Sequence, residues 1–221
     1  MPREQFHRGL TGVEDGVVEM GAMVGRQLDR AMQALTTRDL PLADAVIRDD
    51  GEVNRSRFHI DNVCVSLLAL QAPMASDLRL IVAILSIVSD LERMGDHAEG
   101  IASIVRISEG EPDVMPLAEV TEMARRAGDM LRSSLDAFAQ RSVEMAHRLA
   151  AADDEVDALY ERLYRELVTK MAADESTIEA CTHALWVTHN LERIADRATN
   201  IAERVVYTVT GMMPEMDVSR Y

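Results

Sequence analysis

Two acidic pairs in this sequence have a spacing that could bind a metal ion. Glu92 and Asp96 lie in the phrase LERMGD, and Glu192 and Asp196 lie in the phrase LERIAD one hundred residues later. Residues four apart share one face of a helix, where two carboxylates repel each other by about 0.2–0.5 kcal/mol. A bound cation would turn this repulsion into attraction. The repeated pair therefore points to an oxygen-rich site in each half of the chain.

Acidic and amide side chains occur at the same spacing upstream of each pair. Asp50 and Asn54 are four apart in the first half, as are Asp153 and Asp157 in the second, and Asn200 extends the later row by one turn. In a heptad register all these groups fall on one flank of their helices, beside the apolar seam and outside the core. Two antiparallel helices could bring such rows together as a carboxylate patch in each half.

Oxygen ligands of this kind favour hard or borderline cations. We expect a divalent or trivalent ion, with Fe, Zn, Mn, Mg and Ca as candidates, and several bridging carboxylates would suit a multinuclear site. The alternative is a solvated acidic face inherited from a duplicated ancestor, because Glu-x-x-x-Asp arises readily in an acidic helical protein. The predicted metal ligands are Glu92, Asp96, Glu192, Asp196, Asp50, Asn54, Asp153, Asp157 and Asn200.

The surrounding sequence is helix-periodic along its whole length. Apolar residues recur in steps of three and four from Ile84 to Val105, and again from Ala184 to Val205, which is typical of a buried helix face. No segment alternates in the manner of an amphipathic strand, so an all-α fold is predicted. The expected helices span residues 4–37, 40–70, 75–108, 116–139, 141–172 and 175–211.

An internal repeat divides the chain into two halves. Residues 17–28 align with 120–131, and the phrase DGEVN aligns with DDEVD at the same offset. The segment SEGEPDVMP, rich in Gly, Pro and acidic residues, separates the halves. Short connections imply antiparallel neighbours, so each half is predicted to be a three-helix bundle, with the two bundles related by pseudo-twofold symmetry. The predicted halves are residues 1–110 and 111–221, with a frayed tail from about residue 212.

The composition narrows the possible partners and compartments. The net charge of −15 argues against nucleic acid as a partner, because phosphate backbones require clustered Lys and Arg. The apolar stretch LRLIVAILSIVSDL is shorter than the roughly 20 residues of a membrane helix, and no secretion signal is visible. The distant cysteines, Cys64 and Cys181, indicate inert core thiols in a reducing compartment. We therefore expect a cytoplasmic protein that reaches a membrane only through partners.

The sequence offers no familiar catalytic motif. It lacks a P-loop, a Gly-rich dinucleotide turn, HExxH and a nucleophile elbow. Glu144 and His147 have the Glu-x-x-His spacing of a ferritin-like di-iron bundle, which needs two such motifs projecting inward. The remaining histidines are predicted to be packed or solvated side chains: His59, His97, His183 and His189.

Several of these phrases resemble the PhoU family of phosphate-signalling proteins. The segment APMASDLRLIVAILSIVSDLERMGDHAEGIA is similar to the third helix of that family's first repeat, and HALWVTHNLERIADRATNIAERVVYTVTG to the third helix of its second. DGEVN and DDEVD match its second-helix phrase. The resemblance implies two three-helix bundles with metal clusters on the Glu/Asp-x-x-x-Asp motifs. These motifs map onto Glu92, Asp96, Glu192 and Asp196.

The resemblance also implies a function and a set of partners. The expected role is a negative regulator of phosphate uptake and of the phosphate-starvation response when phosphate is plentiful. The expected partners are the ATPase subunit of a Pst-type phosphate importer and a PhoR-type sensor histidine kinase, both at the inner face of the membrane. We expect an adaptor without enzymatic activity, in the form of a homodimer.

Two departures and two alternatives accompany this resemblance. Gly100 stands where the second repeat has Asn200, which implies fewer or more weakly bound metals in the first half, and Ala195 replaces the glycine seen at Gly95.

One alternative function is a phosphoesterase with a carboxylate-bridged dinuclear metal. The other is a purely structural bundle that oligomerises through its apolar faces.

Overall fold

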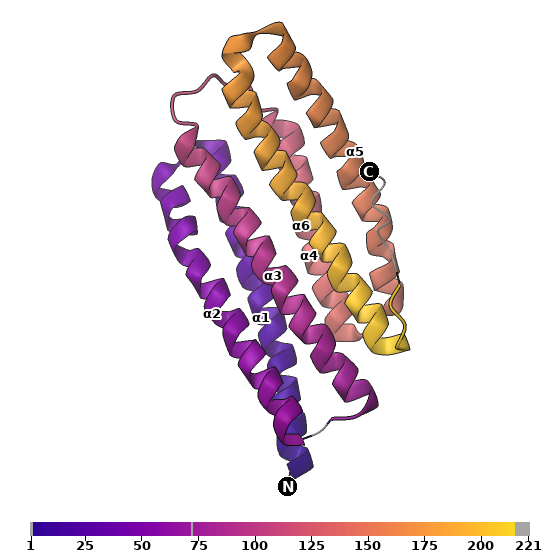
Figure 1. The fold of residues 1–221 in the computed structure, drawn as a ribbon. Helices are drawn as coiled ribbons and strands as arrows, with labels where there is room; N and C mark the ends of the chain where they lie inside the picture. Colours follow the sequence, from indigo (N-terminus) through magenta and orange to yellow (C-terminus); the bar gives the residue numbers. More distant parts are fainter. Residues whose placement is uncertain (1, 72, 215–221) are drawn as a thin grey trace.

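The computed structural model describes residues 2–71 and 73–214, and these residues form long helices joined by short turns (Figure 1). No strand occurs among them, so the predicted all-α class is confirmed. The predicted helix limits agree with the structure to within three residues. The expected frayed tail lies largely outside the described residues. The helices are α1 (Pro2–Thr37), α2 (Leu40–Gln71), α3 (Ala75–Ile107), α4 (Leu117–Gln140), α5 (Val143–Ala173) and α6 (Ile178–Thr210), with the short 3₁₀ helix η1 (Glu175–Thr177) before α6.

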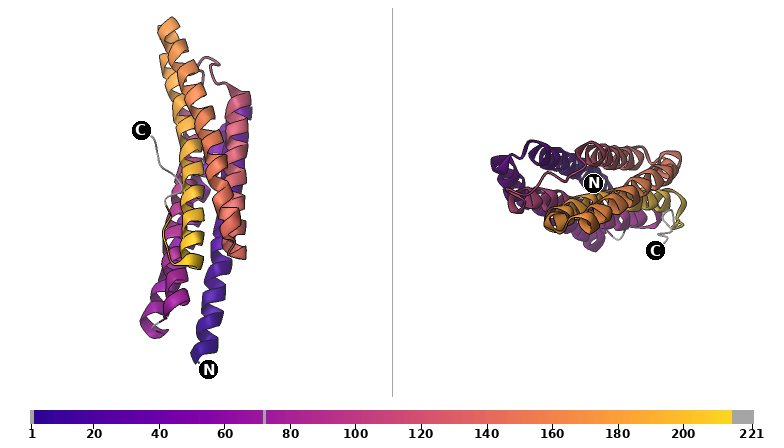
Figure 2. Two further views of the ribbon diagram at one scale, coloured as in Figure 1. Left: turned by 90° about the vertical axis from the view of Figure 1, so that its right-hand side faces the viewer. Right: turned by 90° about the horizontal axis from the view of Figure 1, so that it is seen from above.

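The six helices form two three-helix bundles that lie side by side. In the first half α1, α2 and α3 all contact one another, and in the second half α4, α5 and α6 do the same. The two halves meet where α3 packs against α6 and where α1 packs against α4. The side view in Figure 2 shows an elongated molecule whose helices follow one long axis. The predicted tandem bundle is therefore confirmed.

The core runs without interruption from one half into the other. Leu91 and Met94 on α3 are fully buried, as are Leu191 and Ile194 at the matching positions of α6, and all four belong to one hydrophobic cluster. Full burial of such a side chain stabilises the fold by about 1.5–3 kcal/mol. The two central helices thus hold the motif-bearing segments rigidly against each other.

Side-chain caps determine where several helices begin and end. The backbone N–H of Leu42 donates to Asp39 Oδ1 at 2.9 Å at the start of α2. The N–H of Met145 donates to the hydroxyl of Ser142 at the start of α5, and Gly211 ends α6 with a φ of 79°. Such caps satisfy backbone groups that a helix terminus would otherwise leave without partners. They fix one end each of α2, α5 and α6, three of the helices that carry the acidic residues.

None of the described helices combines the length and the apolar content that crossing a membrane requires.

The linker between the halves, residues 108–116, is held by side chains from both halves. Arg38 pairs with Asp113 at 3.3 Å, and the buried His183 lies 2.8 Å from a carboxylate oxygen of Glu111. His183 is therefore a packed histidine, as predicted.

Candidate metal centre

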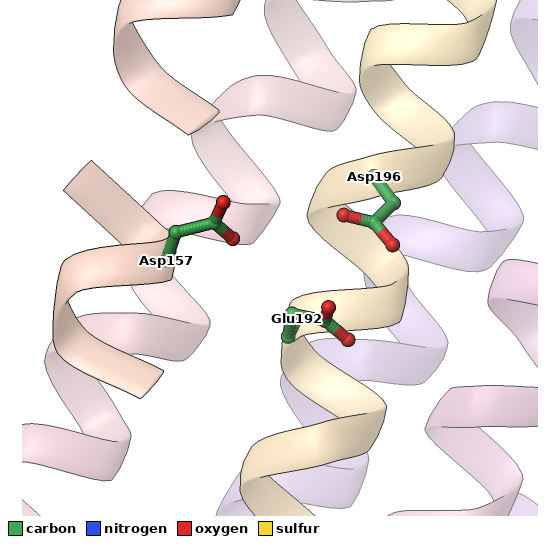
Figure 3. Close-up of side chains that lie close together, drawn as sticks. All are labelled: Asp157, Glu192 and Asp196. Carbon is green, nitrogen blue, oxygen red and sulfur yellow. The ribbon is translucent and has the colours of Figure 1, made fainter. Parts of the chain in front are cut away.

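Three carboxylates of the second half gather between α5 and α6. Asp157 extends from α5 toward α6, where Glu192 and Asp196 lie one helical turn apart (Figure 3). One oxygen atom from each of the three residues can be chosen so that all lie within 4.8 Å of one another. The antiparallel packing of α5 on α6 thus brings Asp157, one member of the predicted α5 row, close to Glu192 and Asp196 of the predicted α6 row.

Glu192 is more deeply buried than the heptad register predicted. Its side chain is only 4% exposed, and Asp153 on α5 is also buried, so placing these two residues beside the core was wrong. The reason is that α6 packs against three helices, α3, α4 and α5, whereas the heptad register assumes one apolar seam. An ionised carboxylate in such a position requires hydrogen bonds or a nearby positive charge.

Several other groups surround this cluster. Arg193 pairs with Asp196 at 2.7 Å, and His189 Nδ1 lies 3.4 Å from Glu192 Oε2. Burial lowers the pKa of His189, with a further lowering by Arg193. Burial raises the pKa of Tyr160, and the Glu192 charge raises it further. The cluster therefore places concentrated negative charge next to a tyrosine and a histidine.

The matching carboxylates of the first half also approach one another. Burial raises the pKa of Asp96, and the charges of Glu92 and Asp50 raise it further. Hydrogen-bond donors of the same half already contact two of these groups: the amide of Asn54 donates to Asp50 at 2.9 Å, and Arg57 lies 2.7 Å from Glu92. Within the described part of the chain, only the second half brings three acidic groups together as closely as 4.8 Å.

Asn200 contacts a different helix from the one that carries Asp157. Its side chain forms a hydrogen bond with Asp90 on α3 that opposes the rise in the Asp90 pKa caused mainly by burial. At the matching position, a Cβ added to Gly100 would lie 3.1 Å from the side chain of Asn190. Both positions thus lie at the interface of α3 with α6, and a ligand role for Asn200 stays a prediction.

Sequence reasoning missed the first-half donors Gln27 and Arg57, whereas His97 is a packed histidine, as predicted. The Gln27 amide donates to Asp50 at 2.9 Å, and His97 Nδ1 lies 2.9 Å from Asn190 Oδ1. The repeat alignment gave only a partial signal for the two donors, because it pairs Gln27 with a thioether and Arg57 with an uncharged phenol. Cys64 is buried as predicted, and burial is the main cause that raises its pKa to about 12.

Comparison with known proteins relates both halves to one family. The sequence model described as the PhoU domain matches residues 17–105 and again 120–205. A phosphate-specific transport system accessory protein PhoU homolog of Clostridium acetobutylicum is 35% identical, with 98% of this chain and 100% of that protein aligned. The phosphate-specific transport system accessory protein PhoU of Escherichia coli is 37% identical, over 94% of this chain and 86% of that protein.

Solved structures agree with these sequence matches. The crystal structure of PhoU from Pseudomonas aeruginosa superimposes with a TM-score of 0.89 at 38% identity, and covers 94% of this chain and 100% of its own. The structure of the phosphate transport system regulatory protein PhoU from Streptococcus pneumoniae gives a TM-score of 0.88 at 34% identity, over 95% and 99% of the two chains. With both repeats matched and relatives aligned over nearly their full length, this chain belongs to the PhoU family.

Proposed function

We propose that this protein regulates phosphate transport as an adaptor without catalytic activity of its own. It binds the ATPase subunit of a Pst-type phosphate importer and a PhoR-type sensor kinase, and it restrains phosphate uptake and the starvation response when phosphate is plentiful. The observation that carries this proposal is membership of a family whose full-length relatives are named accessory proteins of phosphate-specific transport. A homodimer at the cytoplasmic face of the membrane is part of the proposal.

An adaptor needs only different affinities for two states of its partner. Preferential binding to the phosphatase-biased kinase would stabilise that kinase state, and preferential binding to the resting ATPase would slow transport. The rigid double bundle suits this role because its core is continuous across both halves. A surface held in this way presents both partners with a fixed geometry.

Deletion of the gene tests the regulatory role. Because the protein is proposed to be a negative regulator, phosphate uptake and phosphate-regulated transcription should rise in phosphate-rich medium. Expression of the wild-type chain should reverse both changes. Unchanged uptake and transcription in the deletion strain would refute the regulatory proposal, whatever the protein binds.

We further propose that Asp157, Glu192 and Asp196 hold a divalent cation. The chemistry of this donor set supports the proposal, because carboxylate oxygens are the ligands that Mg²⁺, Ca²⁺ and Mn²⁺ prefer. The burial of Glu192 supports it too, since a cation would offset the cost of a buried negative charge. Such a cation would link α5 to α6 and neutralise part of the cluster.

The phosphoesterase alternative depends on the same residues and can be separated from the adaptor role. A carboxylate-bound metal can lower the pKa of a bound water and so supply a nucleophile. Turnover of p-nitrophenyl phosphate in the presence of Mn²⁺ that disappears in Glu192→Gln would favour an enzyme. Co-purification of the importer ATPase or of the sensor kinase with the wild-type chain, without such turnover, would favour the adaptor.

A further inference from the structure

The first-half carboxylates already receive hydrogen bonds and a positive charge from their own half. Asp50 accepts the amide of Gln27 on one oxygen and the amide of Asn54 on the other, each at 2.9 Å. Glu92 lies 2.7 Å from a terminal nitrogen of Arg57. These neighbours supply the hydrogen bonds and the positive charge that stabilise the ionised carboxylates, a role that a bound cation would otherwise have.

All three donors are replaced at the matching positions of the second half. The offset of 103 that aligns DGEVN with DDEVD gives the matching positions. There the second half has a thioether in place of the Gln27 amide, a carboxylate in place of the Asn54 amide, and a phenol in place of the Arg57 guanidinium. The first change removes a donor, the second adds an acidic group, and the third removes a positive charge. The pairs are Gln27 with Met130, Asn54 with Asp157, and Arg57 with Tyr160.

Arg57 is well placed to act as a fixed cation. Its side chain is 28% exposed and that of Glu92 is 17% exposed, so water screens their attraction only in part. Its Nε also lies 3.6 Å from Asp61, one turn further along α2. A guanidinium stays protonated at any physiological pH, so its positive charge remains at the site at all times, whereas a metal ion exchanges with solution.

We propose that the Arg57 guanidinium takes the place of a metal ion in the first half, so that this chain binds cations through its second half alone. This departs from the metal clusters in both repeats that the family resemblance implies. The inference rests on the proposed second-half site for its contrast between the halves. Its direct consequence is that changes in metal supply would alter the second bundle and leave the first unchanged.

Titration with Mn²⁺, followed by the electron paramagnetic resonance signal of the free ion, tests this inference. Wild-type protein should show second-half binding that Glu192→Gln removes. The double variant Arg57→Gln/Glu192→Gln should regain binding at the first half, with an affinity at least tenfold above that of Glu192→Gln. A further Glu92→Gln change should abolish the regained binding, since Glu92 would be one of its ligands.

Two matched variants in the Glu192→Gln background control for charge. Arg57→Lys keeps a positive charge beside Glu92 and should regain no binding. Arg55→Gln removes an exposed guanidinium from the same helix, where it pairs only loosely with Glu52 at 3.7 Å, and should also regain none. Arg57→Tyr introduces the residue type that the second half has at this position, and it should regain binding as Arg57→Gln does. Circular dichroism verifies that each variant folds.

The outcomes separate this inference from the proposed second-half site. Mn²⁺ binding that persists in Glu192→Gln and disappears in Glu92→Gln would overturn the inference, because the first half would bind metal despite Arg57. Folded Arg57→Gln and Arg57→Tyr variants that gain no binding would overturn it too. Binding gained by these variants when wild-type protein binds nothing would support the role of Arg57 in the first half and refute the second-half site.

Discussion

Individual residues at matching positions of the two halves have taken on different chemistry. Glu92 and Glu192 stand in the same phrase, yet Glu92 contacts a guanidinium and Glu192 faces two more carboxylates across 4.8 Å or less. Like charges at this separation repel one another and oppose folding when all are ionised. The metal-free second half should therefore carry an electrostatic cost that a bound cation removes.

The variant Glu192→Gln tests this cost without a large change of shape. In the presence of a chelator it should be more stable than wild type by about 1 kcal/mol, because one of three clustered charges is gone. For a chain of this size that corresponds to a melting temperature about 2–4 °C higher. With millimolar Mn²⁺ the order should reverse, since the ion stabilises only wild type.

Thermal denaturation in chelator and in Mn²⁺ measures both effects. Glu179→Gln, at an exposed position near the start of α6, is the matched control. It should leave both melting temperatures close to those of wild type. A lower melting temperature for Glu192→Gln in both conditions would mean that this carboxylate stabilises the fold by itself, without a cation.

At the scale of helices, the interface between α3 and α6 shows the pseudo-twofold symmetry in its polar contacts. Arg197 on α6 donates to Asp90 on α3 at 2.8 Å, and His97 on α3 lies 2.9 Å from Asn190 on α6. Exchange of the two helices exchanges these pairs, because each residue differs from its equivalent by one hundred in number. An antiparallel pairing with two matched polar contacts fixes how far one helix can slide along the other.

Removal of Arg197 should show how much its pair with Asp90 contributes to the free energy of unfolding. Both side chains are 14% exposed, and a buried charge that loses its partner is strongly destabilising. Arg197→Met should lower the free energy of unfolding by about 3 kcal/mol at pH 7. The double variant Asp90→Asn/Arg197→Met should recover most of this loss, because no buried charge remains.

The pH dependence of this variant follows from the pKa of Asp90. Burial raises that pKa above its usual value and Arg197 opposes the rise, so loss of Arg197 should raise it further. A carboxyl group with a raised folded-state pKa contributes stability that is present below the unfolded pKa and is lost as pH rises through the folded pKa. The deficit of Arg197→Met should therefore shrink as the pH falls from 7 toward about 4. Urea unfolding of wild type and Arg197→Met at these pH values measures the deficit in the free energy of unfolding. A deficit independent of pH would contradict the assignment of the effect to the Asp90 carboxyl group.

The contact between α1 and α4 depends on a glycine. A Cβ at Gly21 would lie 2.3 Å from a methyl of Leu135, a buried residue of α4, so Gly21→Ala should force this side chain to move and destabilise the protein by about 1 kcal/mol. Gly12 lies on the same helix with nothing within 4 Å of an added Cβ. Gly12→Ala should instead stabilise by about 0.5–1 kcal/mol through helix propensity. Chemical denaturation of both variants checks the contrast, and equal effects would refute it.

At the scale of the whole molecule, the sequence was sufficient to predict the helices and their division into two bundles. Apolar periodicity and turn residues are local signals, so they could be interpreted without knowledge of how the helices pack. The burial of Glu192 could not be predicted in the same way, because it depends on which helices cover α6. The donors Gln27 and Arg57 were missed for a related reason. Which neighbouring helix a long side chain contacts can be predicted only once the packing of the helices is known.

The metal content of protein purified without chelator tests the central claim most directly. Elemental analysis should find a divalent metal at a constant ratio to wild-type chain, retained in Glu92→Gln and lost in Glu192→Gln. This result would assign the cation to the carboxylates between α5 and α6. Loss of metal in Glu92→Gln, or equal metal in all three proteins, would contradict the claim that the second half of this chain is its metal site.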